Sequence, residues 1–260
     1  AVKLRMDGLL REAVYEIDPP GLPTDLKSPA LLVFSKTNGF IHKEAIPAAQ
    51  ALYQQLGESN GWSVYLTENA AVHNPEALAR FDAVVWNNVT GDVLTPEQRS
   101  ALQGYVENGG GFVAIHGAGG DPSYAWGWYP QSLIRAQFTA HPMFPQFQEA
   151  TLNVQSPQDP IVSHLPASFS MTDEWSSFQQ PPKDVEVLLK LDESTYSPKI
   201  LFHDISMGKD HPIAWKHCQG KGRVFYGAPG HLASTYTDPR YARVLEQATR
   251  WAMQPDPACQ

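Results

Sequence analysis

Short apolar runs alternate with helical stretches along the first half of the chain. Each run is four to six residues long and is bounded by turn-forming residues, as in strands that are buried on both faces. The runs cover residues 30–34, 62–66, 82–87 and 112–115. Repeated alternation of strand and helix with short connections predicts an α/β fold with a doubly wound, mainly parallel sheet.

The helices between these strands carry their own signals. Asn74 and Thr95 are predicted N-cap residues, because each precedes a proline at the first helical position. Gly109 lies just past the end of the helix that Thr95 begins. The first helix is indicated by apolar residues at helical spacing, namely Ile46, Ala49, Leu52 and Leu56.

The second half of the chain changes to strand-like alternation of apolar and polar residues, which predicts an antiparallel extension of the sheet. The alternating segments cover residues 150–156, 185–191 and 211–217. A last strand over 223–228 precedes a loop and then a capped helix over 238–253. The segment from 121 to about 148 is dense in aromatic residues, histidine and proline, and it shows no simple helical pattern.

We predict one α/β domain over residues 30–254. Residues 1–29 are rich in proline and acidic residues and are expected to form an N-terminal extension. Residues 255–260 form a C-terminal tail. With 260 residues, of which 42% are hydrophobic and 18% charged, the chain can build a single core of this size.

Composition narrows the class of partner. The formal net charge of -8 and the lack of a lysine or arginine run argue against nucleic acid. The longest apolar runs are far shorter than the roughly 20 residues of a membrane-spanning helix, so no membrane partner is expected. The seven Trp, ten Tyr and eleven Phe fit either a well-packed core or a sugar-stacking surface. We expect a small-molecule partner, and a homo-oligomer stays open.

The cellular compartment is indicated by the start of the sequence more than by its cysteines. Cys218 and Cys259 can form at most one bridge, and their spacing leaves the compartment open. The chain begins with Ala1 in place of methionine, as a mature secretory protein does after its signal is removed, although a shortened chain would look the same. We expect a periplasmic or secreted protein, with the cytoplasm as the alternative.

Histidines follow the carboxyl ends of three predicted strands. His42 lies in the loop after the first strand, together with Lys36 and Asn38. His116 follows the fourth strand and His231 the last. Open α/β sheets bind ligands at this edge, so the topology predicts that these distant histidines meet. Each one alone could be a structural histidine, whereas three at one edge predict a shared site.

The glycine-rich stretch around His116 lacks the features of a nucleotide site. Dinucleotide and P-loop motifs need a glycine loop that runs directly into a helix, whereas Asp121-Pro122 and an aromatic loop follow here. Histidine also stands where the nucleophile elbow of a hydrolase carries serine or cysteine. We therefore expect no nucleotide cofactor, and a histidine suited to proton transfer or metal ligation.

Two further positions add to this chemistry. His141 lies in the aromatic-rich segment, and Glu174 belongs to the sequence Asp173-Glu174-Trp175. If Glu174 faces the histidines, the group can bind a divalent metal, zinc or another transition metal; without a metal it can act as general acid and base. An exposed acidic turn is the alternative. Surface positions are predicted for two other histidines, His73 and His217.

Five ordered motifs are spread over residues 35–238: "SKTNGFIHKEAIPAA", "GGGFVAIHGAG", "WGWYPQSLIRAQFTAHP", "DEWSSF" and "PIAWKHCQGKGRVFYGAPGHLASTYTD". With the closing "ATRWAM", they resemble the ThuA-like family, which is named for trehalose utilisation. The resemblance implies the class I glutamine amidotransferase-like fold, a flavodoxin-like sheet with helices on both faces. His116 replaces the nucleophilic cysteine of true amidotransferases, so glutamine hydrolysis by that route is not expected.

The resemblance also implies an enzyme of sugar catabolism that acts on 3-keto-glycosides. Elimination followed by hydration, a net hydrolysis, needs a base and an electrophile at the ketone. The expected catalytic residues are His42, His116, Glu174 and His231, and the same residues together with His141 are the expected metal ligands. The expected substrate-binding residues are Lys36, Asn38, Trp126, Trp128, Tyr129, Asp173 and Trp175.

Two other functions stay open. The first is a glycan-binding module without catalysis, which would use the aromatic segment to hold a sugar. The second is a metal-dependent hydrolase that acts on esters or amides on the same scaffold.

Overall fold

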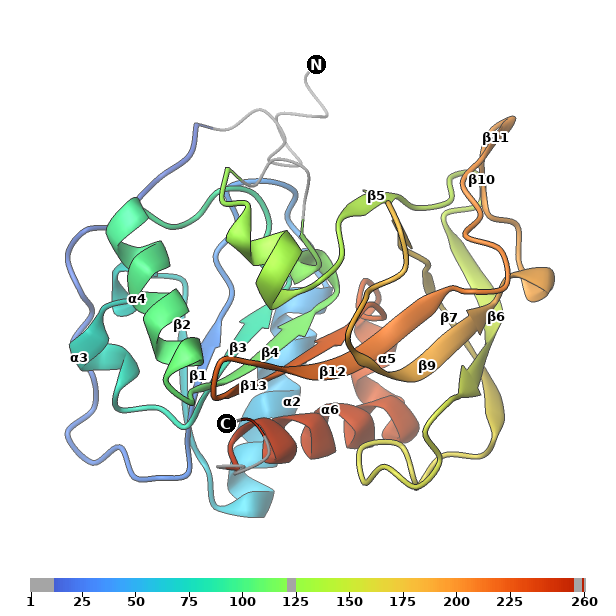
Figure 1. Ribbon diagram of the computed structural model, residues 1–260. Coiled ribbons are helices and arrows are strands. Elements are labelled where there is room, and N and C mark those ends of the chain that lie inside the picture. The colour runs from blue at the N-terminus through green and yellow to red at the C-terminus, as the bar shows by residue number, and fades with distance from the viewer. Residues whose placement is uncertain (1–11, 121–124, 255–258, 260) are drawn as a thin grey trace.

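The computed structural model describes residues 12–120, 125–254 and 259. Within these residues one nine-stranded sheet runs through the molecule in the order β2-β1-β3-β4-β13-β12-β9-β6-β7 (Figure 1). The first five strands of this order are parallel, and the remaining four continue the sheet antiparallel. The predicted flavodoxin-like α/β fold with an antiparallel extension is confirmed.

The parallel half consists of short strands joined by helices. Its strands are β1 (Ala30–Phe34), β2 (Ser63–Thr67), β3 (Ala83–Asn87), β4 (Gly111–Ile115) and β13 (Gly222–Gly227). All of them except β2, at the edge, are buried along their whole length, as the continuous apolar runs predict.

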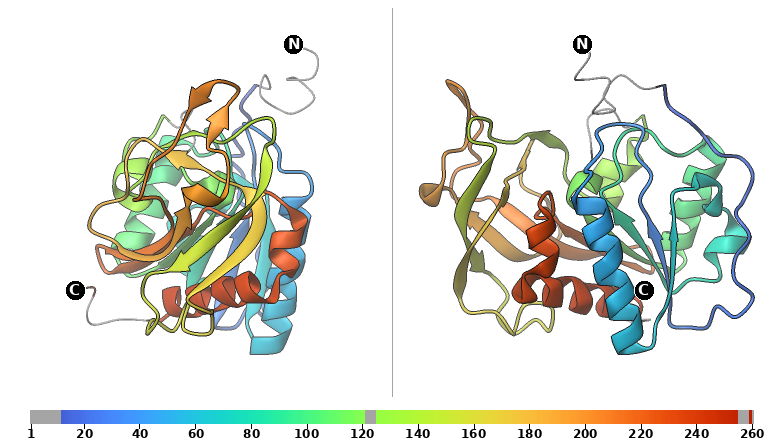
Figure 2. Two further views of the ribbon diagram at one scale, coloured as in Figure 1. Left: turned by 90° about the vertical axis from the view of Figure 1, so that its right-hand side faces the viewer. Right: turned by 180° about the vertical axis from the view of Figure 1, so that it is seen from behind.

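Helices cover both faces of this half. The helices are α2 (Ala45–Asn60), α3 (Pro75–Leu78), α4 (Pro96–Glu107), α5 (Ala233–Thr237) and α6 (Pro239–Ala252). Figure 2 shows α2 and α6 together on one face of the sheet, with α3 and α4 on the other. Asn74 and Thr95 cap their helices as predicted, and Thr95 forms a reciprocal capping box with Gln98.

The antiparallel half is built from β12 (Pro212–Gln219), β9 (Glu186–Asp192), β6 (Phe147–Val154) and the edge strand β7 (Ser168–Glu174). Two short pairs lie outside this sheet, β5 (Phe138–Ala140) with β8 (Ser177–Phe178), and β10 (Lys199–Ile200) with β11 (His203–Asp204). The short helical turns are η1 (Ala70–Val72), η2 (His116–Ala118), η3 (Tyr129–Leu133) and η4 (Glu193–Thr195). None of the helices in the described residues is long and apolar enough to cross a membrane.

Hydrogen bonds hold part of the N-terminal segment against the domain. Glu16 pairs with Lys36 and accepts a hydrogen bond from the backbone N–H of Ala70. The side chain of Gln98 donates to the backbone carbonyl of Glu16 at 2.7 Å. Residue 16 therefore contacts the loop after β1, η1 and α4, three segments that are far apart in the sequence.

A disulfide joins Cys218 of β12 to Cys259, and the two cysteines are separated by 41 residues. Because such a bridge restricts the unfolded chain, we expect reduction to lower the free energy of unfolding by about 2–4 kcal/mol. Urea unfolding with and without reductant measures this difference. The double variant Cys218→Ser/Cys259→Ser should unfold like the reduced protein and should not respond to reductant. Equal stability of the oxidised and reduced protein would contradict the expectation.

Candidate functional site

His116 occupies the turn at the carboxyl end of β4. Its backbone lies in the left-handed region, with φ 47°, which is uncommon for a residue other than glycine. Its Nδ1 is 2.7 Å from the backbone carbonyl oxygen of Ala228. A carbonyl oxygen can only accept, so Nδ1 carries the proton and Nε2 presents a lone pair. Burial lowers the pKa of this imidazole, against the opposing effect of Glu174, and favours its neutral form.

His42 and His231 lie against His116, as the topology predicts. The His42 ring centroid is 4.8 Å from the centroids of both other rings. Nδ1 of His231 is 3.3 Å from Nε2 of His116. One nitrogen atom from each histidine lies within 4.8 Å of the other two. The loop after β1, the turn after β4 and the loop after β13 thus meet at one edge of the sheet.

Two glycines make this close approach sterically feasible. A Cβ atom at Gly117 would lie 2.8 Å from Cε1 of His42. At Gly230, where φ is 143°, a Cβ would lie 3.0 Å from Cβ of His116 and 2.6 Å from the Tyr236 hydroxyl. Any larger residue at these two positions would push the imidazoles apart.

Glu174, the last residue of β7, reaches the same place from the antiparallel half. Its Oε2 lies 3.2 Å from Nδ1 of His231 and 3.3 Å from Nδ1 of His141, and its Oε1 lies 3.6 Å from Nε2 of His116. Gln146 also donates a hydrogen bond to this carboxylate. Burial by itself raises the pKa of Glu174, but the hydrogen bond to His231 and electrostatic interaction with the neighbouring histidines lower it well below its usual value. Glu174 is therefore ionised.

We call His42, His116, His141, Glu174 and His231 the histidine cluster. His141 is its most exposed member, with 27% of the side chain accessible, and it reaches the others through Glu174. Nδ1 of His141 is also 3.0 Å from the backbone carbonyl oxygen of Pro142. Both neighbours of Nδ1 are acceptors, so in the neutral form of the ring Nδ1 carries the proton and Nε2 has the lone pair.

The cluster has the features of a divalent metal site. Nδ1 of His42 is buried without a hydrogen-bond partner in the described part of the chain. Burial, and then electrostatic interaction with the neighbouring rings of His116 and His231, lowers the pKa of His42 well below its usual value, so its imidazole is neutral. A buried unpartnered nitrogen costs about 1–3 kcal/mol, and a metal ion would give it a partner. Imidazole nitrogens beside a carboxylate are a donor set that fits zinc or a related transition metal.

Asp173 holds the loop of His231, so its predicted role in binding substrate is wrong. The side chain is fully buried and is not part of an exposed acidic turn. Its carboxylate accepts hydrogen bonds from the backbone N–H groups of Gly230 at 2.7 Å and His231 at 3.0 Å. It also accepts one from the Thr235 hydroxyl at 2.5 Å. A carboxylate with this many partners is not free to contact a sugar.

For two of the four aromatic residues that were predicted to stack on a sugar, the prediction is wrong because the side chains are buried. Trp175 and Tyr129 are fully buried, and the Tyr129 hydroxyl donates to the carbonyl oxygen of Ala118 at 2.7 Å. Both rings belong to the core, and Tyr129 also supports the turn after β4, so neither ring offers a face to a sugar. Trp126 and Trp128 are partly exposed and stack on each other, with ring centroids 5.0 Å apart. Their predicted role in sugar binding stays a prediction.

The aromatic residues that contact the imidazoles are phenylalanines that sequence reasoning missed. The Phe40 ring centroid lies 4.9 Å from that of His42 and 6.0 Å from that of His231. The Phe147 centroid lies 5.0 Å from that of His231. Phe40 lies two residues before His42 in the same loop, and this closeness in the sequence could have indicated that its ring lies near the histidines.

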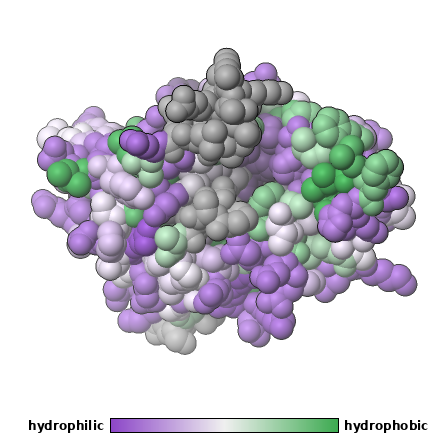
Figure 3. Space-filling view, turned by 90° about the horizontal axis from the view of Figure 1, so that it is seen from above, coloured by the Kyte–Doolittle hydropathy of each residue, from purple (hydrophilic) through white to green (hydrophobic). Residues whose placement is uncertain are grey.

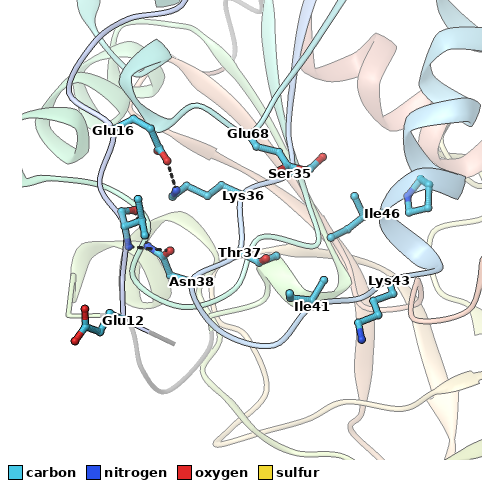
Figure 4. Close-up of a pocket in the computed structure, with 12 residues that line it drawn as sticks. Glu12, Glu16, Ser35, Lys36, Thr37, Asn38, Ile41, Lys43, Ile46 and Glu68 are labelled. Atoms are coloured by element: carbon cyan, nitrogen blue, oxygen red, sulfur yellow. Dashed lines mark hydrogen bonds and ion pairs between the residues drawn. The ribbon is translucent and has the colours of Figure 1, made fainter. Parts of the chain in front are cut away.

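Lys36 and Asn38 line a cavity of about 540 Å³ beside the loop of His42 (Figure 4). Figure 4 shows Lys36 and Glu16 pointing toward each other, and their nitrogen and oxygen atoms are 2.5 Å apart. The Asn38 amide donates to the backbone carbonyls of Val14 and Asp92. Lys36 thus holds the N-terminal segment, and Asn38 holds both that segment and the loop after β3. That either side chain contacts substrate stays a prediction.

His73 and His217 are buried, so their predicted surface positions are wrong. His73 makes a hydrogen bond with the Ala70 carbonyl oxygen through Nδ1 and accepts one from the Trp86 indole at Nε2. Burial lowers the pKa of His73 to about 4 and that of His217 to about 3. The polar residues around them in the sequence gave no sign of this, because both side chains face inward from their segments.

Comparisons with known proteins agree with this fold. A family model described as ThuA, trehalose utilisation, matches residues 30–252. A ThuA-like protein from Bacteroides uniformis is 25% identical, with a TM-score of 0.76 over 93% of this chain and 98% of that one. A ThuA-like protein from Parabacteroides merdae is 15% identical, with a TM-score of 0.66 over 88% and 91% of the two chains. A β-galactosidase from Rahnella sp. R3 is 13% identical, with a TM-score of 0.55 over 88% of this chain and 32% of its own. No curated protein matches the sequence.

The hydrogen bonds of Asp173 predict that Asp173→Ala is strongly destabilising. The variant leaves buried N–H and O–H donors without an acceptor, so the free energy of unfolding should fall by about 3 kcal/mol. Urea unfolding measures the change. Asp204→Ala is the matched control, because Asp204 is exposed and its carboxylate accepts a hydrogen bond from the backbone N–H of Ser206. A loss for Asp173→Ala no larger than for the control would contradict the anchoring role.

Proposed function

The chain belongs to the ThuA family, described as trehalose utilisation, and on that premise we propose that it is an enzyme of sugar catabolism that cleaves 3-keto-glycosides at the histidine cluster. The family relates the protein to carbohydrate metabolism. The observation that carries the proposal is a group of three imidazoles, with ligand nitrogens within 4.8 Å of one another, beside an ionised carboxylate at the edge where such sheets bind ligands.

In this proposal a divalent transition metal is held by His42, His116 and His231, with Glu174 as a further donor. The ligand nitrogens of the three histidines lie within 4.8 Å of one another, and Glu174 approaches two of them. When bound, the metal supplies a Lewis acid for the ketone oxygen at C3 of the sugar. Asp173 and Gly117 act through the ligands, since they fix the loop of His231 and the space beside His42.

Proton transfer in the proposed reaction belongs to His141. The ketone at C3 acidifies the C2 proton, and Nε2 of His141 takes that proton while Glu174 stabilises the imidazolium that forms. The electron pair of the C2–H bond forms the C1=C2 double bond, and the C1–O bond to the leaving sugar breaks. The departing oxygen takes up a proton to give an alcohol. Water then adds across C1=C2, with oxygen at C1 and hydrogen at C2, so the net change is hydrolysis.

The disulfide supports a periplasmic or secreted location in the same proposal. Disulfides persist in oxidising compartments and are rare in the cytosol. Cys218 and Cys259 are the two cysteines of the sequence, and they are joined to each other.

The first test of the proposal is metal binding. The purified protein should bind one equivalent of zinc after loading and dialysis, measured by elemental analysis. His42→Ala, His116→Ala and His231→Ala should each weaken zinc binding by at least about 100-fold, because each removes a ligand. His164→Ala is the control, since His164 is exposed and contacts the Arg240 carbonyl oxygen. Full zinc binding by His116→Ala would contradict the metal site.

The second test separates the base from the ligands. His141→Gln should keep its zinc and lose about 10²–10⁴-fold in kcat on a 3-keto-disaccharide, because it lacks the proton acceptor. His116→Ala should lose turnover completely while circular dichroism shows an intact fold. Unchanged turnover by either variant would contradict the mechanism. Sugar binding by the wild type without any turnover would favour a glycan-binding module, and activity on esters or amides alone would favour a metal hydrolase.

A further inference from the structure

Phe147 is placed against the histidine cluster by strand pairing. In the antiparallel register of β6 and β7, Phe147 lies directly opposite Glu174. Residues that pair in this way project from the same face of the sheet, so the Phe147 ring and the Glu174 carboxylate share one face. The ring centroid of Phe147 is 5.0 Å from that of His231.

The alternation along both strands places this pair on the face that points away from the core. Phe147 has the same parity in β6 as the exposed Glu149, whereas Ala150 and Leu152 face the core. In β7, Glu174 has the parity of the exposed Thr172, yet it is buried. At one end of the paired strands, an apolar ring and a buried acid thus interrupt a face that is otherwise polar. Phe147 is 39% exposed and does not belong to the apolar core.

We infer that Phe147 is a specificity-determining residue, on whose ring the apolar C–H face of a pyranose stacks beside the histidine cluster. This inference rests on the proposed function for the class of ligand. An exposed aromatic face next to a few buried polar groups is the usual composition of a small-molecule site. Phe40, whose ring also contacts His231, supplies a second aromatic wall from the loop after β1.

A stacked ring contributes equally before and during the reaction, because it touches no atom whose bonds change. Phe147→Ala should therefore weaken trehalose binding by about tenfold or more and raise KM for the 3-keto derivative, while kcat stays close to that of the wild type. Phe147→Trp keeps an aromatic face and should stay within about threefold of the wild type. Phe147→Leu keeps apolar volume without a ring face and should behave like the alanine variant.

Phe202→Ala is the matched control. Phe202 is fully exposed at the turn between β10 and β11, where Leu201 is also exposed. Figure 3 shows the apolar surface of this hairpin at the side of the molecule. Removal of this ring should change neither sugar binding nor KM. If any exposed apolar side chain contributed to sugar binding, Phe202→Ala would weaken that binding as well.

The experiment measures trehalose binding by calorimetry, and kcat and KM on the 3-keto derivative, with zinc-loaded wild type and variants. Wild-type affinity and KM in Phe147→Ala would overturn the inference, and so would full rescue by Phe147→Leu. If the wild type cleaves keto-glycosides and Phe147→Ala is unchanged, the inference fails and the proposed function stands. If the wild type binds trehalose through Phe147 but cleaves no keto-glycoside, the proposed function fails and the inference stands.

Discussion

The burial of one ionised carboxylate is the constraint on which the site depends. Glu174 lies at the end of the edge strand β7 with 6% of its side chain exposed, where an isolated charge is strongly unfavourable. It stays ionised because His116, His141 and His231 surround it. The carboxylate in turn draws these imidazoles together, so the antiparallel extension and the parallel half of the sheet meet at one charged group.

The backbone around the cluster is adapted to the same constraint. Asp173, the neighbour of Glu174, turns to the opposite side of β7 and binds the N–H groups of Gly230 and His231. Asp173 therefore positions the loop after β13, and its neighbour Glu174 contacts the imidazole of His231 in that loop. The left-handed turn at His116 and the missing side chain at Gly117 then bring the third strand end within reach. The left-handed backbone at His116 is an unfavourable conformation, and the contacts around it stabilise it.

The sheet and the meeting of the histidines could be predicted because both follow from rules of topology. Continuous apolar runs identify buried parallel strands, and the carboxyl ends of such strands share one edge, so His42, His116 and His231 meet without any local motif. The direction of a side chain within the antiparallel half was harder to predict. Trp175 was expected to bind substrate and is buried. Phe147 was overlooked, although its parity with Glu149 sets it on the polar face of its strand.

Side chains that make long-range contacts could not be assigned from the sequence. The carboxylate of Asp173 binds a loop 57 residues away, and Lys36 pairs with Glu16, which lies in a segment without a strand or helix pattern. Such partners depend on the final packing of loops, for which a single sequence carries no periodic signal. The buried positions of His73 and His217 have the same origin, since their local surroundings in the sequence are polar.

In the proposed site the imidazoles of His42, His116 and His231 act together as ligands of one metal ion. X-ray absorption spectroscopy of the zinc-loaded protein tests this claim most directly, because imidazole rings produce a characteristic outer-shell scattering pattern. We expect a four- or five-coordinate zinc ion with three imidazole nitrogens at about 2.0–2.1 Å and oxygen donors in the remaining positions. A zinc ion surrounded by oxygen alone, without imidazole scattering, would contradict it.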